Sequence, residues 1–327
     1  MNRGQDEPGS ARGPFDAARS VMLLANPVSQ LGRGEQVARM VAETMKARLS
    51  PRTAFRLVFT QHEGHAAQIA SSLHDVDVLI VLGGDGILNE TVNGLMRLDR
   101  ADRPALGLVP VGSGNDFART AGMSFHPERA TNQLFSACST PLDLGCCNGR
   151  YFIETLSFGL DAAIALDTVR RRERMDSTGL ALYVASSWYQ LRHNRVVYRY
   201  SASVDGGPPV NGDMLLFAVQ MGPTYGSGFR ICPDAHVDDG LLDVCIAHPR
   251  ISLPGAVGIF ALAKFGRHTR VRHLEMFRAH RLHVEFDCRP ACQVDGEPMH
   301  DTVFDVDVTS DELDVLLASD RALAGGR

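Results

Sequence analysis

The chain has 327 residues, of which 44% are hydrophobic, and a formal net charge of -5 at pH 7. This length suits one large or two ordinary domains, and the acidic balance excludes the overall basic character of nucleic-acid-binding proteins. The seven cysteines form no Cys-x-x-Cys pair, so we expect reduced thiols in a cytoplasmic protein and no disulfide framework.

The apolar segments of the chain predict no membrane-spanning helix. Residues 1–18 are polar, Gly-rich and Pro-containing, without the apolar core of a signal peptide, and we predict a disordered tail there. The longest later apolar run, residues 253–265, is shorter than the ~20 residues of a spanning helix. We expect a core helix in this run in preference to a patch that touches a membrane surface.

Residues 19–144 alternate short apolar segments with amphipathic ones, which is the pattern of a parallel sheet covered by helices. The predicted strands are residues 20–26, 54–60, 76–82 and 105–111. The predicted helices are residues 35–49, 65–73 and 88–98, and a fourth begins near Asn115. In such a doubly wound sheet the loops that follow the strands gather at one edge, where these folds bind ligands.

After residue 145 the pattern changes to closely spaced β-type segments, interrupted by one helical insert over residues 167–193. We predict a mostly antiparallel second domain. Residues 310–324 have a helical pattern and are expected to pack back on the first domain. The predicted division is a tail over residues 1–18, an α/β domain over residues 19–144 together with 310–327, and a second domain over residues 145–309.

Three loops at the predicted sheet edge contain small and turn-forming residues. The first, residues 26–34, is a weak signal, since Asn-Pro also begins an ordinary turn. The second, residues 83–86, has three glycines around Asp85 and frees several N–H groups to face an anion; a tight turn capped by Asp85 is the structural alternative. The third, residues 112–116, repeats this composition. Together the loops predict a nucleotide cradle that lacks the lysine of a P-loop.

Two acidic turns in the second half are further candidates. Asp238 and Asp239 precede a glycine and a strand, which fits a Mg²⁺ ligand and an ordinary hairpin turn equally well. Asp295 and Glu297 flank a glycine, and this signal is weak by itself. The arginines within residues 170–174 could face anionic headgroups, although a solvated helix face is the commoner explanation.

In chain order, the segments NPVSQLGRG, GGDGILNE, VPVGSGNDFAR, GSGFRICPDAHVDDGLLDV and VDGE closely resemble the diacylglycerol kinase family of lipid kinases, in particular the bacterial soluble type related to sphingosine kinases. The resemblance spans nearly the whole chain, from Val21 to Val308. It implies an ATP-binding domain like that of phosphofructokinase and NAD kinases, followed by an antiparallel β-sandwich that supplies the lipid site. It also implies transfer of the γ-phosphate of ATP to a lipid hydroxyl at the inner face of the membrane, with diacylglycerol as the first expectation, and a homodimer.

The resemblance assigns roles position by position. Glu297 and Asp85 are the expected catalytic carboxylates, with Glu297 as the base that accepts the hydroxyl proton. Asp239, with the carbonyl groups of His236 and Leu241, is the expected Mg²⁺ position. The residues expected to hold ATP are Asn26, Pro27, Ser29, Thr60, Gly83, Gly84, Asp85, Gly86, Asn89, Glu90, Gly112, Ser113, Asn115 and Asp116.

Two departures from the family pattern leave other functions open. Ile87 stands where the family usually has threonine, and Gln30 stands where a glycine usually follows the serine. They would suit a catalytically weak protein that binds a nucleotide or a lipid as a regulator. A soluble small-molecule kinase of the NAD kinase type would also use Gly-Gly-Asp-Gly on this kind of domain, although the segments NDFAR and PDAHVDDGLLDV fit the lipid branch better.

Overall fold

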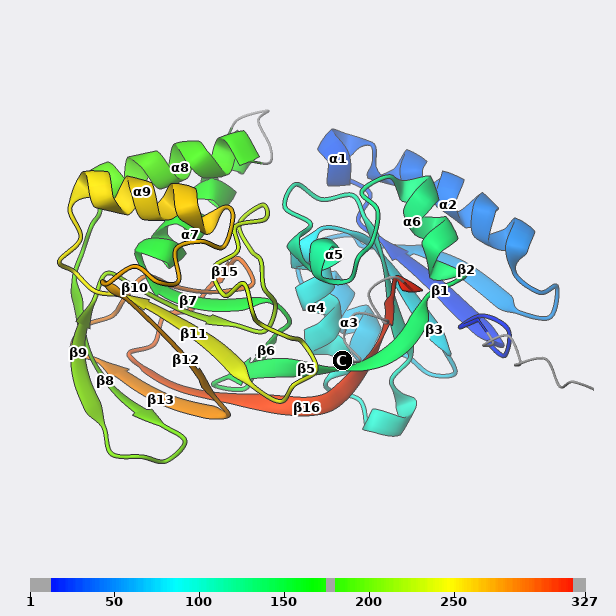
Figure 1. The fold of residues 1–327 in the computed structure, drawn as a ribbon. Coiled ribbons are helices and arrows are strands. Elements are labelled where there is room, and N and C mark those ends of the chain that lie inside the picture. Colours follow the sequence, from blue (N-terminus) through cyan, green and yellow to red (C-terminus); the bar gives the residue numbers. More distant parts are fainter. Residues whose placement is uncertain (1–12, 175–179, 320–327) are drawn as a thin grey trace, which may run out of the picture.

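The computed structural model describes residues 13–174 and 180–319 of the chain. Two lobes lie side by side, an N-terminal α/β lobe and a C-terminal lobe built mainly from strands (Figure 1). This arrangement confirms the predicted combination of an α/β domain with a mostly antiparallel β-sandwich domain. No helix among the described residues is long and apolar enough to cross a membrane.

A parallel sheet with the strand order β2-β1-β3-β4 forms the centre of the N-terminal lobe. Its strands are β1 (Ser20–Ala25), β2 (Ala54–Phe59), β3 (Val78–Gly83) and β4 (Ala105–Pro110). Its helices are α1 (Ser29–Gly32), α2 (Gly34–Arg48), α3 (His65–Ser71), α4 (Asp85–Leu95), the 3-10 helix η1 (Arg100–Asp102), α5 (Asp116–Thr120) and α6 (Pro127–Leu134). The chain passes from β1 outward to β2 and then back to β3, so right-handed crossovers place α2 on one face of the sheet and α3 and α4 on the other.

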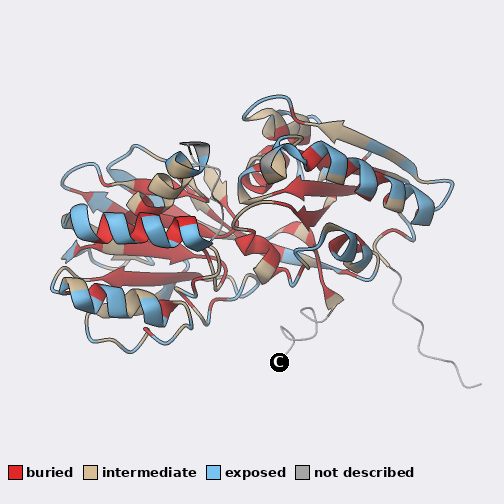
Figure 2. Cartoon of the chain, turned by 90° about the horizontal axis from the view of Figure 1, so that it is seen from above, coloured by how far each residue is buried: buried red, intermediate tan, exposed pale blue. Residues whose placement is uncertain are grey.

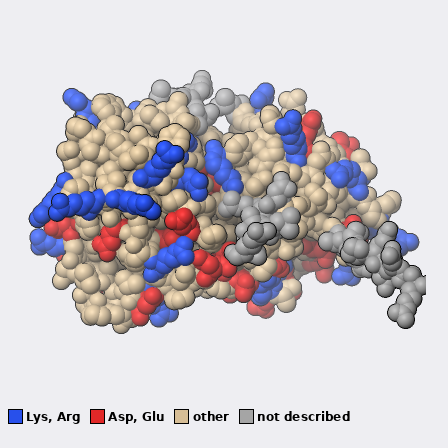
Figure 3. Space-filling model, viewed as in Figure 1, with Lys and Arg blue, Asp and Glu red and all other residues tan. Residues whose placement is uncertain are grey.

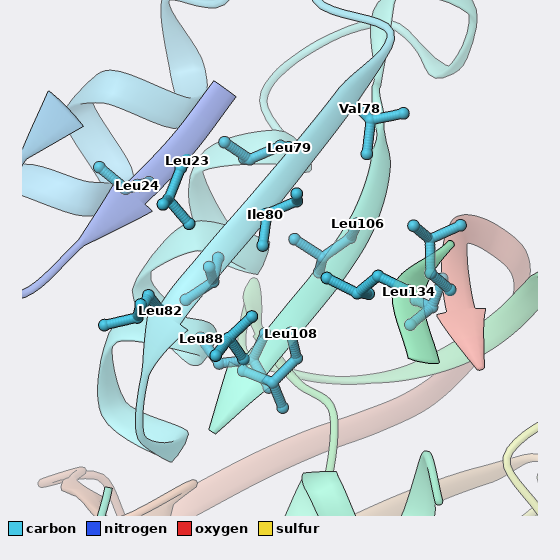
Figure 4. Packing of buried hydrophobic residues seen from close by; sticks show 14 of the residues in the cluster. Leu23, Leu24, Val78, Leu79, Ile80, Leu82, Leu88, Leu106, Leu108 and Leu134 are labelled. Carbon is cyan, nitrogen blue, oxygen red and sulfur yellow. The ribbon is translucent and has the colours of Figure 1, made fainter. Parts of the chain in front are cut away.

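Helices on both faces explain the unbroken apolar run of β3, which is buried along its whole length. Figure 4 shows the side chains of Leu79 and Ile80 from β3 near Leu106 of β4, with Leu134 of α6 beyond. The buried residues follow the sheets through both lobes, whereas the outer faces of the helices are exposed (Figure 2).

Two packed sheets form the C-terminal lobe. One has the order β16-β13-β8-β9, with β5 beside β16 and β6 beside β5, and the other has the order β12-β11-β10-β7-β14-β15. Their aromatic core includes Phe158, Phe217 and Phe304. The strands are β5 (Cys138–Cys147), β6 (Arg150–Phe152), β7 (Thr155–Gly159), β8 (Tyr198–Val204), β9 (Val210–Met214), β10 (Leu216–Gln220), β11 (Leu242–Ala247), β12 (Leu274–Ala279), β13 (Arg281–Phe286), β14 (Cys292–Val294), β15 (Glu297–Pro298) and β16 (Val303–Leu317), and the helices are α7 (Leu160–Arg174), α8 (Leu180–His193) and α9 (Leu253–Ala263).

The long strand β16 joins the two lobes into one continuous sheet. Its later part pairs in parallel with β4, where Val315 lies opposite Leu106, and its earlier part pairs with β13. The strand β5 runs antiparallel to it over nearly its full length. Because β5 and β16 both pass from one lobe to the other, the predicted domain boundaries at residues 144 and 309 stay predictions.

The helix predicted for residues 310–324 is wrong where the structure describes it, because β16 continues to Leu317. Leu313 and Val315, two positions apart on this strand, are both buried in the core of the N-terminal lobe, as expected for a strand with one face on the core. A bulge between Thr309 and Leu313 interrupts the pairing with β5 and obscures this alternation in the sequence. Residues 320–327 lie outside the described residues.

Three other predictions also need correction. Residues 1–12 of the predicted tail lie outside the described residues, but Phe15 is buried against Phe135 in the core of the N-terminal lobe, because an aromatic ring gains from leaving water. The helical insert consists of the two helices α7 and α8, and residues 175–179 between them lie outside the described residues. The predicted core helix is α9, of which only Ala256 and Ala263 are buried.

Candidate active site

A cleft of about 820 Å³ lies between the two lobes. The loops after β1, β3 and β4 line it from the N-terminal lobe, as the strand order of a doubly wound sheet requires. From the C-terminal lobe it is lined by residues of α7, the loop after β10 and the turn between β14 and β15. The predicted edge of the sheet is therefore one wall of the cleft.

The second and third glycine loops meet backbone to backbone. A Cβ atom placed on Gly84 would lie 2.9 Å from Cα of Gly112, so a side chain at either position would separate the loops. The N–H of Gly112 donates to the Asn115 side chain at 2.8 Å, which keeps the third loop folded before α5 begins. The sequence expectation that these two loops come together is correct.

The first loop is a compact turn at the end of β1. The Asn26 side chain accepts the N–H of Val28 at 3.0 Å, and the Ser29 hydroxyl donates to the carbonyl of Asn26 at 2.9 Å. Gln30 has a φ of 51°, in the left-handed region that favours glycine. The departure of Gln30 from the family pattern thus places a residue with a side chain in a backbone conformation suited to glycine.

Four carboxyl groups are crowded at the base of the cleft: those of Asp85, Asp116, Glu154 and Asp295. Burial and the neighbouring Asp116 carboxylate raise the pKa of Asp85 to about 7, and backbone N–H groups at the start of α5 partly offset the rise. Burial, followed by the charges of the other three groups, raises the pKa of Glu154 well above its usual range. Glu154 is 4% exposed, and among the described residues its Oε1 atom has no hydrogen-bond partner. Burial and repulsion therefore favour the protonated form of Glu154 more than they would for an exposed glutamate.

Asp116 connects the N-terminal lobe to a loop of the C-terminal lobe. Its two carboxylate oxygens accept the N–H groups of Ser227 at 2.8 Å and Gly228 at 2.7 Å. On the other side of the same loop, Lys264 Nζ donates to the carbonyl of Ser227 at 2.8 Å. The loop of residues 225–229 is therefore held at both edges, and Asp116, although it borders the cleft, already has a partner for each oxygen.

Asp295 forms a second connection between the lobes. Its carboxylate accepts the Asn89 side-chain amide at 2.8 Å and the N–H groups of Ile153 at 2.9 Å and Thr155 at 2.8 Å. Asn89 belongs to α4, whereas the other groups belong to the C-terminal lobe. Asn89, expected to hold ATP, instead spans the lobe boundary in this structure.

Glu297 lies at the start of β15 on the wall opposite the glycine loops, and it is half-buried. Burial raises the pKa of its carboxyl, and the charges of Arg150 and Arg172 act in the opposite direction. Arg172 of α7 and Arg33, just before α2, also line the cleft. These two guanidinium groups bring positive charge to a site whose glycine loops contain no lysine.

The cleft brings together many of the predicted site residues, but not all of them. Those that line it are Asn26, Ser29, Gly84, Asp85, Gly86, Gly112, Ser113, Asp116 and Glu297. Pro27, Thr60, Gly83, Asn89, Glu90 and Asn115 are near the same loops without lining it. Glu90, for example, accepts the N–H of Ala66 at 3.2 Å and caps α3.

The predicted metal position lies outside the cleft. Asp239 accepts the N–H of Leu241 at 3.2 Å, and its other oxygen is 3.6 Å from the Arg278 guanidinium. Among the described residues no three His, Cys, Asp or Glu side chains come together as a ligand set. A cation at this position would therefore rely on backbone carbonyl groups such as those of His236 and Leu241.

An apolar cavity of about 80 Å³ lies beside the cleft, under α7, α8 and α9. Most of its lining is aliphatic or aromatic, including Ile164, Phe229 and Phe260. Tyr183 and Tyr225 line both the cavity and the cleft, so they form a shared wall between them. The Tyr183 ring packs directly on Gly226, where any side chain would collide with it.

Several residues of the cleft were not among the predicted site residues: Arg33, Glu154, Thr155, Tyr183 and Tyr225. Asp295 and Arg172 also line the cleft, and the sequence had offered both only as weak candidates. Glu154 did give a signal, because it is a single acidic residue inside the apolar segment YFIETLSFG. Tyr183 and Tyr225 gave none, since an aromatic residue near a turn or in a helix is usually part of the core.

Comparisons with known proteins agree with this geometry. Residues 20–147 match the family described as diacylglycerol kinase catalytic domain, and residues 154–317 match the one described as YegS C-terminal NAD kinase beta sandwich-like domain. The chain is 31% identical over 236 residues to a diacylglycerol kinase of Bacillus subtilis (strain 168), which covers 71% of this chain and 75% of that protein. It is also 25% identical over 300 residues to a probable lipid kinase YegS-like of Serratia proteamaculans (strain 568). That match covers 90% of this chain and 93% of the relative.

Solved structures share the fold. A diacylglycerol kinase structure from Bacillus anthracis str. Sterne has a TM-score of 0.77 at 21% identity and covers 93% of this chain and 99% of that one. An NAD kinase from Archaeoglobus fulgidus, crystallised in complex with ATP, has a TM-score of 0.51 at 12% identity. The match covers 94% of this chain and 97% of the NAD kinase chain. The expected relationship of the fold to NAD kinases is confirmed.

The connection through Asp116 predicts a loss of stability in Asp116→Asn. An amide has one acceptor oxygen, so one of the two loop N–H groups would lose its partner, which costs about 2 kcal/mol of unfolding free energy. Urea denaturation measures this loss. The control is Asp213→Asn, an exposed carboxylate 3.6 Å from Arg199, which should change stability by less than ~1 kcal/mol. Equal effects of the two substitutions would contradict the role of Asp116.

The crowded carboxyl groups predict that the protein becomes less stable as the pH rises. The Asp85 carboxyl has a usual pKa of 3.8 and a pKa of about 7 in the folded state. Between these two pH values the folded state binds more protons than the unfolded state, so the free energy of unfolding falls as the pH rises. Glu154→Gln should make the decrease of unfolding free energy with pH less steep. It should also raise the unfolding free energy at about pH 8 by on the order of 1 kcal/mol. Thermal denaturation across this pH range measures both effects. A steeper slope in the variant would contradict the assignment.

Proposed function

Since the chain belongs to the diacylglycerol kinase family of lipid kinases, we propose that it transfers the γ-phosphoryl group of ATP to a lipid hydroxyl. The proposed acceptor is diacylglycerol, and the product would be phosphatidic acid. The relatives named diacylglycerol kinase support this acceptor, and the ATP in the related NAD kinase structure supports the donor.

One observation carries the proposal of a lipid acceptor, namely the wall that the cleft shares with the apolar cavity. Tyr183 and Tyr225 border both spaces. A lipid whose hydroxyl group lies in the cleft would therefore have its chain beside an apolar cavity, where transfer of chain surface from water is favourable. A soluble acceptor such as NAD would have no use for an apolar cavity next to its phosphorylation site.

The nucleotide half of the reaction would use the N-terminal lobe. Phosphoryl transfer depends on positioning and on stabilising the charge of the equatorial oxygens, with little covalent chemistry by the protein. The backbone amides around Gly84 and Ser113 would bind the phosphate oxygens at the edge of the sheet. Arg33 and Arg172 would supply the positive charge that a lysine supplies in a P-loop.

The proton of the acceptor hydroxyl would pass to a carboxylate in the cleft. Glu297 is the proposed base because it lies on the wall that bears the lipid cavity, opposite the glycine loops. Asp85 lies among the glycine loops, where its carboxyl would orient the phosphate end of the reaction. The raised pKa of each group makes it a better proton acceptor once ionised.

Asp239 is the proposed ligand of a Mg²⁺ ion, together with the carbonyl oxygens of His236 and Leu241. This donor set is made of hard oxygen atoms, which suits the ion. Mg²⁺ bound there would hold the loop before β11 and neutralise its acidic side chains. Because these residues do not line the cleft, we assign them no part in the transfer itself.

The proposed function predicts phosphate transfer to diacylglycerol that depends on Glu297 and Asp85. The purified protein with Mg-ATP should phosphorylate diacylglycerol in mixed micelles and leave NAD unmodified, as mass spectrometry of the products would show. Glu297→Gln should lower kcat by about 10² to 10⁴ with no loss of thermal stability, and Asp85→Asn should also lower kcat strongly. Phosphorylation of NAD, or full activity in both variants, would refute the assignment.

The apolar cavity predicts a dependence on chain length. Ala256→Phe would fill the cavity from α9, so the KM for a long-chain diacylglycerol should rise about tenfold, equivalent to ~1.4 kcal/mol, while dioctanoylglycerol is affected less. Micellar kinetics with both lipids measure this difference. The control is Ala261→Phe, which adds the same ring on the exposed side of the same helix. An equal rise of KM for both lipids would argue against a chain site in this cavity.

A further inference from the structure

The outer side of α9 is apolar although it faces solvent. This helix, of sequence LPGAVGIFALA, contains no charged or hydrogen-bonding side chain, and only Ala256 and Ala263 are buried. Val257 and Leu262 are exposed, and Phe265, just after the helix, is 72% exposed. A solvent-facing helix normally places polar residues on its outer face, so this one suits a less aqueous surrounding.

The adjacent helix α8 adds an apolar stripe. Leu180, Val184 and Trp188 are spaced four residues apart, so they lie on one side of the helix, and all three are exposed. α8 and α9 lie next to each other on the same side of the C-terminal lobe (Figure 1). Trp188 is 52% exposed and is the one tryptophan of the chain. We call the side chains of Leu180, Val184, Trp188, Val257, Leu262 and Phe265 the α8–α9 face.

Exposed apolar side chains are concentrated here and not spread over the molecule. Fourteen large hydrophobic side chains are exposed among the described residues, and six of them make up the α8–α9 face. Single exposed apolar residues need no explanation, but a contiguous group marks an interaction surface.

The charge beside this surface is positive in a protein that is acidic overall. Residues 249–274, which contain α9, include no Asp or Glu and carry five formal positive charges, from Arg250, Lys264, Arg267, Arg270 and Arg272. In Figure 3 several Lys and Arg side chains gather over the upper part of the C-terminal lobe, and its Asp and Glu side chains lie lower. Apolar side chains next to a basic rim match the two layers of an anionic membrane surface.

The α8–α9 face also covers the proposed chain site. The inner side of α9 lines the apolar cavity with Ala256, Ile259 and Phe260, while Val257 and Leu262 point to the other side of the same helix. A membrane bound at this face would therefore lie directly over the helix that lines the cavity.

From these observations we propose that the α8–α9 face docks on a bilayer that contains anionic lipids, with the arginines after α9 at the headgroups. This inference rests on the proposed function, because it gives the lipid acceptor a route to the cavity. A second copy of the chain is the other possible occupant. Charge argues against a symmetric dimer through this face, since the five positive charges of one copy would meet those of the other.

Trp188 makes docking directly observable without ATP or turnover. We expect its fluorescence maximum to shift to shorter wavelength when vesicles of equal parts phosphatidylcholine and phosphatidylglycerol are added, and the protein to sediment with them. Pure phosphatidylcholine vesicles should bind much less. No shift and no sedimentation with the anionic vesicles would overturn the proposal. A shift that follows protein concentration without lipid, with a doubled mass in sedimentation equilibrium, would overturn it in favour of a dimer.

Three variants separate the contributions. Val257→Asp with Leu262→Asp should abolish binding to the anionic vesicles, and Arg270→Glu with Arg272→Glu should weaken it by about tenfold or more. The control is Val210→Asp, which places one aspartate at an exposed valine on β9 and should bind like the wild type. Equal binding by all variants, or equal loss in the control, would overturn the proposal.

Activity assays distinguish failure of docking from failure of the proposed function. The docking variants should phosphorylate dispersed dioctanoylglycerol at the wild-type rate and lose activity on long-chain diacylglycerol in vesicles. Wild-type protein that binds vesicles without phosphorylating either lipid would refute the lipid kinase function and leave the docking surface in place. Variants that keep full activity on vesicle-borne lipid would refute docking as the route of the substrate.

Discussion

Carboxylates that accept amide N–H groups across the lobe boundary are the contacts on which the cleft depends. Asp116 accepts two N–H groups of the 225–229 loop, and Asp295 joins the Asn89 side chain to the amides of Ile153 and Thr155 at the start of β7. Both contacts lie at the base of the cleft, so the two walls are fixed relative to each other where reacting groups would meet. Catalysis by positioning requires this kind of rigidity.

The same contacts concentrate negative charge where a nucleotide would bring more. Burial raises the pKa of Asp85, Asp116, Glu154 and Asp295, and repulsion from neighbouring carboxylates adds to the rise for Asp85 and Glu154. Protonation of some of these groups reduces the charge that a triphosphate would meet. Backbone amides and the guanidinium groups of the cleft act in the same direction, and this balance explains how an acidic cleft could accept an anionic substrate.

The sequence predicts the N-terminal lobe well, because local patterns determine it. An apolar strand followed by glycines marks the second and third edge loops, and the packing of Gly84 on Gly112 follows from their positions after neighbouring strands. The partners of Asp116 and Asn89 were not predictable in this way. Ser227 and Asp295 lie more than a hundred residues away in the chain from Asp116 and Asn89, and a polar side chain next to a glycine loop suggests a ligand and a structural contact equally well.

The C-terminal strand shows a second limit of local patterns. Residues 310–317 include consecutive buried residues next to a bulge, so neither a helical nor a strand period is clear, and only the pairing with β4 and β5 decides the outcome. The exposed apolar side of α9 has a related cause. An apolar run predicts burial, but the sequence alone does not say whether protein or another apolar medium covers it.

The role of β16 also bears on how the chain folds during synthesis. The strand β4 is at the edge of the parallel sheet until Val315 of β16 pairs with Leu106. Val315 is synthesised 209 residues after Leu106. Until then β4 exposes unpaired amide and carbonyl groups on an otherwise complete parallel sheet, which is a template for wrong pairing. Contacts this distant in sequence also form slowly, so covering of this edge is expected to be a late step of folding.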